Sequence, residues 1–130
     1  MNRTEEREQA FLIVFEKIFR DDDIAEIIEY AKEARECDDN EYVNDVAFGV
    51  YKNIDAIDKY ISDNSKGWSI KRISKVGLAA MRIAVYEILY RDDIPVSVSI
   101  NEAVELIKKY ATVDDSSFAN GILGTIARSI

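Results

Sequence analysis

Residues 76–91, VGLAAMRIAVYEILYR, decide the fold class of this chain. Apolar residues lie nearly all round a helix drawn through this stretch, and a helix that is apolar on most sides is buried among others. Asp92 and Asp93 follow it, and then Pro95, which biases Ile94 toward an extended backbone. The sequence therefore predicts a central, buried helix that other helices surround.

Amphipathic stripes with helical spacing precede the central segment. They predict helices over about 4–19 and 24–34 and one long helix over about 43–62. The pair Asp38-x-x-Glu41 is typical of the start of this third helix. Gly49 lies inside it at some cost in helix propensity, which indicates a close helix crossing.

Residues 62–67, SDNSKG, form the clearest loop, and a short helical turn is expected over 68–73. Beyond the central helix, Ser99-x-x-Glu102 and Thr112-x-x-Asp115 resemble capping boxes that begin two further helices. The prediction is an all-α fold with about seven helices.

Length and composition exclude several fold classes and kinds of functional site. The 130 residues correspond to a single domain, and one proline and five glycines are too few for the turns of a β-sandwich or barrel. The absence of histidine excludes histidine-based triads and HExxH zinc sites, and the single Cys37 excludes an intramolecular disulfide. The longest apolar run, Ala10–Phe15, is too short to span a membrane, and no signal-peptide segment is present. We expect a cytoplasmic protein without a metal, cofactor or catalytic residue.

Charge is distributed unevenly along the chain. The net charge is −8, but residues 1–65 carry 8 Lys/Arg against 18 Asp/Glu, whereas residues 66–91 have a net charge of +5. An acidic whole argues against non-specific nucleic-acid binding, while a local basic patch is compatible with a small, directed contact. Taken alone, such a patch is more often a solvated surface.

Two features near the C-terminus have both a structural and a functional interpretation. Acidic pairs such as Asp114-Asp115 fit helix N-termini better than a cation site. Phe118 follows one turn later, near free backbone amides, and an aromatic ring beside such donors can hold single-stranded bases and phosphates. Spacing alone favours a core position for Phe118.

Four ordered motifs resemble the NusB transcription antitermination family, and the resemblance covers essentially all 130 residues. They are Arg3…Arg7-Glu8-x-Ala10, Met81–Leu89 (MRIAVYEIL), Asp93-Ile94-Pro95 with Ile100–Lys108 (INEAVELIK), and Phe118–Leu123 (FANGIL).

The resemblance implies two packed helical bundles, residues 1–65 and 66–130. It implies binding of the boxA segment of nascent ribosomal RNA together with NusE, a small-subunit ribosomal protein, and then action on an elongating RNA polymerase with other Nus factors. The RNA-facing residues implied by position are Arg3, Arg7, Asp114, Ser117, Phe118 and Asn120. Tyr86 and Glu87 would face NusE.

The chain departs from the family at its basic tract. Thr4, Glu5 and Glu6 stand where many members have basic residues or alanine, and Ser117 occupies an often basic position. Because phosphate neutralisation carries RNA affinity, we expect weak binding to RNA alone and a stronger dependence on NusE.

Other classes remain open at this point. A protein–protein adaptor of the same fold with lost RNA binding fits the thinned basic tract. A related domain precedes the catalytic domain of a ribosomal RNA methyltransferase, but no glycine-rich cofactor segment follows before Ile130, which favours a free-standing factor. An uncharacterised enzyme has little support without a nucleophile arrangement. A homodimer through helix one is the alternative oligomeric state, which light scattering with and without RNA tests.

Overall fold

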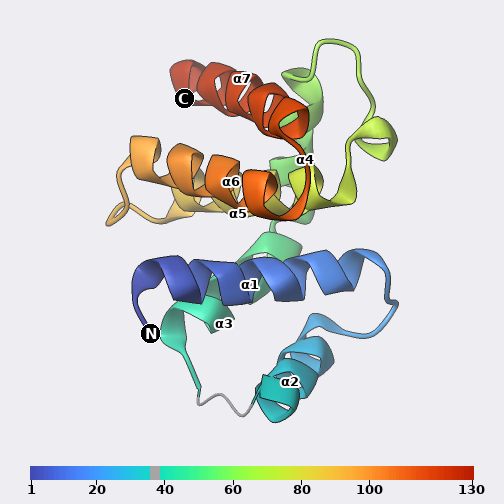
Figure 1. The fold of residues 1–130 in the computed structure, drawn as a ribbon, viewed down its shortest axis with the longest axis vertical. Coiled ribbons are helices and arrows are strands. Elements are labelled where there is room, and N and C mark those ends of the chain that lie inside the picture. The colour runs from blue at the N-terminus through green and yellow to red at the C-terminus, as the bar shows by residue number, and fades with distance from the viewer. Residues whose placement is uncertain (36–38) are drawn as a thin grey trace.

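The computed structural model describes residues 1–35 and 39–130, which form seven α-helices and one short 3₁₀ turn (Figure 1). The all-α prediction is confirmed. The helices are α1 (Arg3–Ile18), α2 (Ile24–Arg35), α3 (Glu41–Lys52), α4 (Ile54–Asp63), α5 (Lys75–Tyr90), α6 (Val96–Tyr110) and α7 (Val113–Ser129), and the 3₁₀ turn η1 is Ile70–Arg72.

The helix expected over 43–62 is wrong as a single element. α3 ends at Lys52 and α4 begins at Ile54, with Asn53 between them at φ −112° and ψ 24°. The Asn53 side chain donates to the Gly49 carbonyl at 2.8 Å, and such local side-chain bonds compete with helix continuation. The seven observed α-helices therefore include α4 as a separate helix. The short turn after the loop is a 3₁₀ turn and is not one of the seven.

The capping expectations had mixed outcomes. Thr112 caps α7 as predicted, since its hydroxyl accepts the Asp115 N–H at 3.0 Å. The prediction that Ser99 caps the next helix is wrong. Helix α6 begins at Val96, directly after Pro95, and Ser99 is buried inside the helix. Asp38 lies outside the described residues, and Asn40 caps α3.

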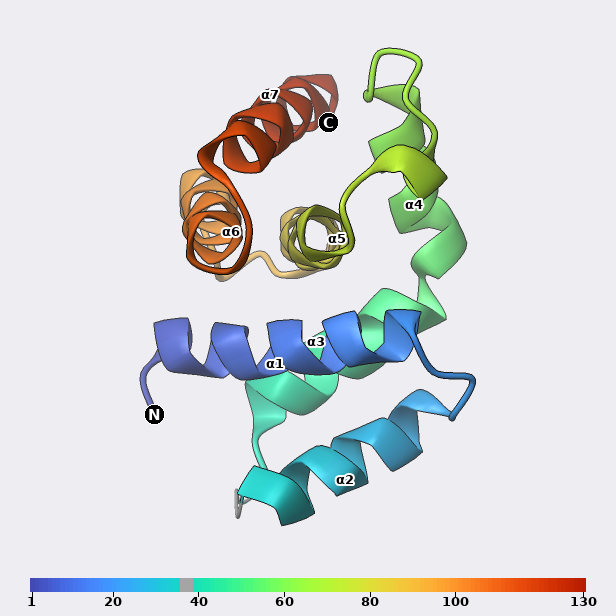
Figure 2. The ribbon, with the colours of Figure 1, turned by 45° about the vertical axis from the view of Figure 1, so that its right-hand side comes forward.

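Helix α5 lies at the centre of the molecule, as its sequence predicted. Figure 2 shows it nearly end-on, with α1 below and α4, α6 and α7 around it. Helices α1, α2 and α3 pack on one another, and α1 and α3 also contact α5. Because α4 packs on α5 and α7, the change from one group of helices to the other falls at Asn53.

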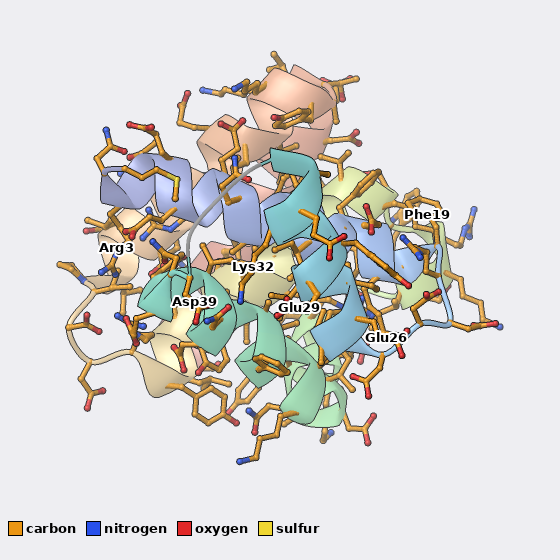
Figure 3. The ribbon with its side chains drawn as sticks, turned by 90° about the horizontal axis from the view of Figure 1, so that it is seen from below. Arg3, Phe19, Glu26, Glu29, Lys32 and Asp39 are labelled. Atoms are coloured by element: carbon orange, nitrogen blue, oxygen red, sulfur yellow. The ribbon has the colours of Figure 1, made fainter. Side chains whose placement is uncertain are left out.

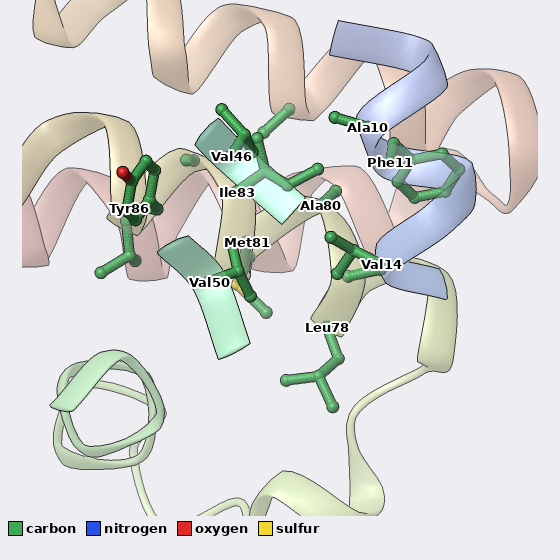
Figure 4. Close-up of a cluster of buried hydrophobic side chains, with 14 of the residues drawn as sticks. Ala10, Phe11, Val14, Val46, Val50, Leu78, Ala80, Met81, Ile83 and Tyr86 are labelled. Carbon is green, nitrogen blue, oxygen red and sulfur yellow. The ribbon is translucent and has the colours of Figure 1, made fainter. Parts of the chain in front are cut away.

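One continuous core joins the two groups. Phe11 and Val14 of α1 meet Val46 of α3 and Met81 and Ile83 of α5, all of them buried (Figure 4). The burial of such apolar surface is the main stabilising contribution to a fold of this kind.

Helix α2, from the acidic half of the chain, lies on the side opposite α7 (Figure 1). Figure 3 shows this face, where Lys32 lies among acidic side chains and forms ion pairs with Glu29 and Asp39. Among the described residues, no helix combines the length and the apolar character that crossing a membrane requires.

Candidate nucleic-acid interface

The first two turns of α7 carry polar side chains on either side of the Phe118 ring. Asp114, Ser117 and Asn120 are exposed, and Phe118 is half-buried between them and the protein. The Thr112 cap satisfies one of the first backbone N–H groups, and the others at a helix start point outward as donors. The structure thus brings four of the predicted RNA-facing residues together.

A second aromatic residue, Trp68, completes this site, although no motif in the sequence assigns it a role. Trp68, which follows the loop after α4, lies edge-on to Phe118 with ring centroids 5.8 Å apart and an interplanar angle of 63°. The Arg72 guanidinium lies over the Trp68 ring at 4.9 Å, a cation–π arrangement. Trp68 is 47% exposed. In the sequence, only the basic stretch around Trp68 points to a binding role for it.

These rings border a pocket of about 210 Å³. Helix α5 supplies one wall of the pocket and the start of α7 another. The lining residues are Trp68, Arg72, Ile73, Ser74, Gly77, Met81, Asp114, Asp115, Phe118 and Ala119.

The basic stretch 66–91 separates into paired and unpaired cations. Arg82 donates to both oxygens of Asp58 at 2.9 and 2.8 Å, and Arg91 is held by Asp45 and Asp93. Four exposed cations make no ion pair within the described part of the chain. These are Lys66, Lys71, Arg72 and Lys75, and all four lie on the segment that carries Trp68.

The two arginines of α1 lie elsewhere, outside the Trp68–Phe118 pocket. Arg3 is exposed at the start of α1, where it pairs with Glu6 at 3.2 Å and lies over the Tyr42 ring at 4.5 Å. Arg7 is only 2% exposed, and its Nε donates to Glu87 at 2.8 Å while Nη1 lies 3.3 Å from Glu102. Its guanidinium faces the protein interior, so its placement differs from the phosphate-facing one implied by position.

The placement of Glu87 also differs from expectation. This carboxylate is fully buried and accepts hydrogen bonds from Arg7, Tyr42 and Ser99, so it does not lie on a partner-facing surface. Glu87 is the only acidic residue of α5, and a buried carboxylate needs donors, which α1, α3 and α6 supply.

Tyr86 borders a separate groove between α3 and α5. Its hydroxyl donates to Asp45 at 2.8 Å, and burial together with this hydrogen bond raises the pKa of Tyr86 to about 12. Phe48 and Tyr90, both exposed, line the same groove. Across residues 1–35 and 39–130, no group of acidic side chains is arranged to hold a metal ion.

Comparisons with known proteins agree with this architecture. The model of the NusB family matches residues 4–128. The transcription antitermination protein NusB of Acetivibrio thermocellus is 45% identical over 130 residues, which cover 98% of this chain and 90% of that protein.

Solved structures give the same result. NusB of T. maritima superposes with a TM-score of 0.86 at 34% identity, covering 98% of this chain and 92% of that one. A chain in a crystal structure of antitermination factors NusB and NusE in complex with double-stranded RNA gives 0.89 at 25% identity, with 100% of both chains covered. With the family match over almost its whole length, this chain belongs to the NusB family.

Proposed function

We propose that this chain is a transcription antitermination factor that binds boxA RNA of nascent ribosomal RNA together with NusE and promotes processive transcription in the cytoplasm. The relatives that carry the name of antitermination protein, and the likeness to a chain solved with NusE and RNA, support it. The observation that carries it is the surface where Trp68, Phe118 and the unpaired cation Arg72 meet at the start of α7. Binding alone accounts for this activity, and no catalytic step is part of the proposal.

The RNA contacts divide between bases and phosphates. Phe118 stacks on a base, with Asp114, Ser117 and Asn120 around it, because aromatic platforms hold unstacked bases regardless of sequence. Arg3 reaches phosphate from the start of α1, and the exposed Lys71 adds a second phosphate contact near the pocket. Arg7 acts indirectly: its buried pair with Glu87 fixes α1 against α5.

NusE is proposed to contact the C-terminal part of α5. Tyr86 borders the groove there, while Glu87 supports this part of α5 from within. The exposed rings of Phe48 and Tyr90 supply apolar surface of the kind that protein interfaces bury. Through NusE, the RNA-bound pair joins the elongating RNA polymerase and other Nus factors.

A second function is an adaptor that binds NusE without RNA. The observation in its favour is that Arg7 is buried and Arg3 is partly neutralised by Glu6, which removes cations from the side that the family resemblance assigns to phosphate.

Transcription through a terminator tests the proposal. RNA polymerase elongating on a template with boxA should read through more often when this protein and NusE are added, and a scrambled boxA should remove the gain. Phe118→Ala should abolish it, while Tyr30→Ala, which removes an exposed ring from α2, should not. Equal readthrough on both templates would contradict the proposal.

A further inference from the structure

We propose that the pocket between Trp68 and Phe118 takes one unstacked base of the RNA and prefers guanine, whose donor edge faces Asp115. This inference rests on the proposed RNA-binding function and adds the base that the site selects.

The pocket has the size and the walls that a base requires. A cavity of about 150 Å³ in another protein is large enough for benzene, so the 210 Å³ here accommodates a planar heterocycle. Trp68 and Phe118 lie edge to face, which leaves one ring to stack on an entering base and the other to close its side. Bases bound to single-strand-binding proteins stack on such side chains.

The carboxylates at the pocket carry the specificity. Asp114 and Asp115 both line it, and neither carboxylate accepts a side-chain hydrogen bond or pairs with a cation within the described residues. Phosphate oxygens would be repelled there, whereas N–H groups of a base would be attracted. Asp115 is the less exposed of the two, so its oxygens are the better shielded acceptors.

Among the four bases, guanine best matches the two acceptor oxygens of the Asp115 carboxylate. Its N1–H and N2 amino group lie side by side on one edge, so they can donate to the two oxygens of a single carboxylate. The N3–H of uracil is flanked by carbonyl oxygens, which a carboxylate repels. A paired contact of this kind discriminates between bases by about 1–3 kcal/mol, which corresponds to about 5- to 150-fold in affinity.

The cations are placed for the phosphates on either side of that base. The Arg72 guanidinium lines the pocket and lies over the Trp68 ring, and Lys71 and Lys75 are exposed close to it in the sequence. The pocket therefore offers carboxylates to the N–H groups of a base, and a guanidinium to its attached phosphate, within one set of lining residues.

The single tryptophan of the chain makes the pocket directly observable. Titration of the whole protein with guanosine 5′-monophosphate and uridine 5′-monophosphate, followed by Trp68 fluorescence, should give at least about fivefold tighter binding of the guanine nucleotide. Asp115→Asn should bring the two affinities together, because an amide offers one acceptor and one donor. Phe118→Leu should weaken both nucleotides, and Tyr30→Ala should change neither. Equal affinities for the unaltered protein, or a preference that survives Asp115→Asn, would overturn the inference.

A second arm separates this inference from the function on which it rests. Short boxA-containing RNA labelled for anisotropy should bind Trp68→Ala about 5- to 150-fold more weakly than the unaltered protein. If the RNA binds both proteins equally, the pocket assignment fails while RNA binding stands. If the RNA binds neither protein, with or without NusE, the proposed function fails as well.

Discussion

Replacing Glu87 by glutamine tests whether one buried carboxylate joins the two groups of helices. In the structure this side chain is 0% exposed and accepts from Arg7 Nε at 2.8 Å, from Arg7 Nη2 at 3.3 Å and from Ser99 Oγ at 2.7 Å. The Tyr42 hydroxyl donates to it as well. These donors belong to α1, α6 and α3, so three helices are tied to α5 through a single group.

The expected loss follows from the charge that Glu87→Gln leaves behind. Breaking a buried ion pair by removing one partner costs about 3–5 kcal/mol, because the remaining charge is buried without compensation. The Gln amide also places donors against the donors of Arg7 or Tyr42. Glu102, 3.3 Å from Arg7 Nη1 and partly exposed, compensates in part. We therefore expect a loss of about 3 kcal/mol, equivalent to roughly 10 °C in Tm for a domain of this length.

Urea unfolding followed by far-ultraviolet circular dichroism measures this loss in a double-mutant cycle with Arg7→Met. The double variant has no unpaired buried charge, so it should be more stable than the sum of the single effects predicts, by at least about 1 kcal/mol. A loss below about 1 kcal/mol for Glu87→Gln, or additivity within about 0.5 kcal/mol, would refute the reasoning.

Three further predictions concern packing and pH. Gly49→Ala should destabilise the fold by about 1–2 kcal/mol, because a Cβ there would lie 2.2 Å from the Tyr86 ring. Gly121→Ala should not destabilise it, because a Cβ there would meet no packed neighbour beyond its own helix backbone within 4 Å; urea midpoints compare the two variants. The hydrogen bond from Lys109 lowers the pKa of the Glu8 carboxyl below its ordinary 4.5. The ionised Glu8 therefore stabilises the fold above pH 4.5, and this contribution is lost as the pH falls through the lowered pKa. Urea midpoints of Glu8→Gln and the unaltered protein should therefore converge under acid conditions. The pKa of about 12 for Tyr86 means that its neutral form stabilises the fold below pH 10 and that this is lost as the pH rises through 12. Tyrosine absorbance followed against pH, with the Tyr86→Phe titration subtracted from that of the unaltered protein, should show the ionisation of Tyr86. A midpoint near pH 10 would contradict the raised pKa.

Much of the fold could be predicted because hydrophobic spacing is a local property. The central helix was evident from residues 76–91 alone, and the Thr112 cap from a short local pattern. The break at Asn53 could not be predicted, since the apolar stripe continues through it in the correct helical phase. Ser99 has the local pattern of a helix cap, but its hydroxyl bonds to Glu87 on another helix, and no local pattern indicates that contact.

The candidate site was predictable only in part for the same reason. Phe118 and its polar neighbours lie on one helix and could be grouped by spacing. Trp68 is 50 positions earlier, and only the tertiary fold brings its ring to that of Phe118. For Arg7, position in a motif indicated a role at the surface, whereas the tertiary contact with Glu87 decides where the side chain lies.

Fluorescence anisotropy of a short boxA RNA tests the central claim most directly. We expect weak binding to this protein alone, which falls as salt increases because phosphate contacts release counterions. Cognate NusE should tighten binding of boxA but not of a scrambled RNA, and Phe118→Ala should remove the gain. If NusE binds the protein but boxA RNA is not bound under any of these conditions, the chain is an adaptor and the antitermination account is contradicted.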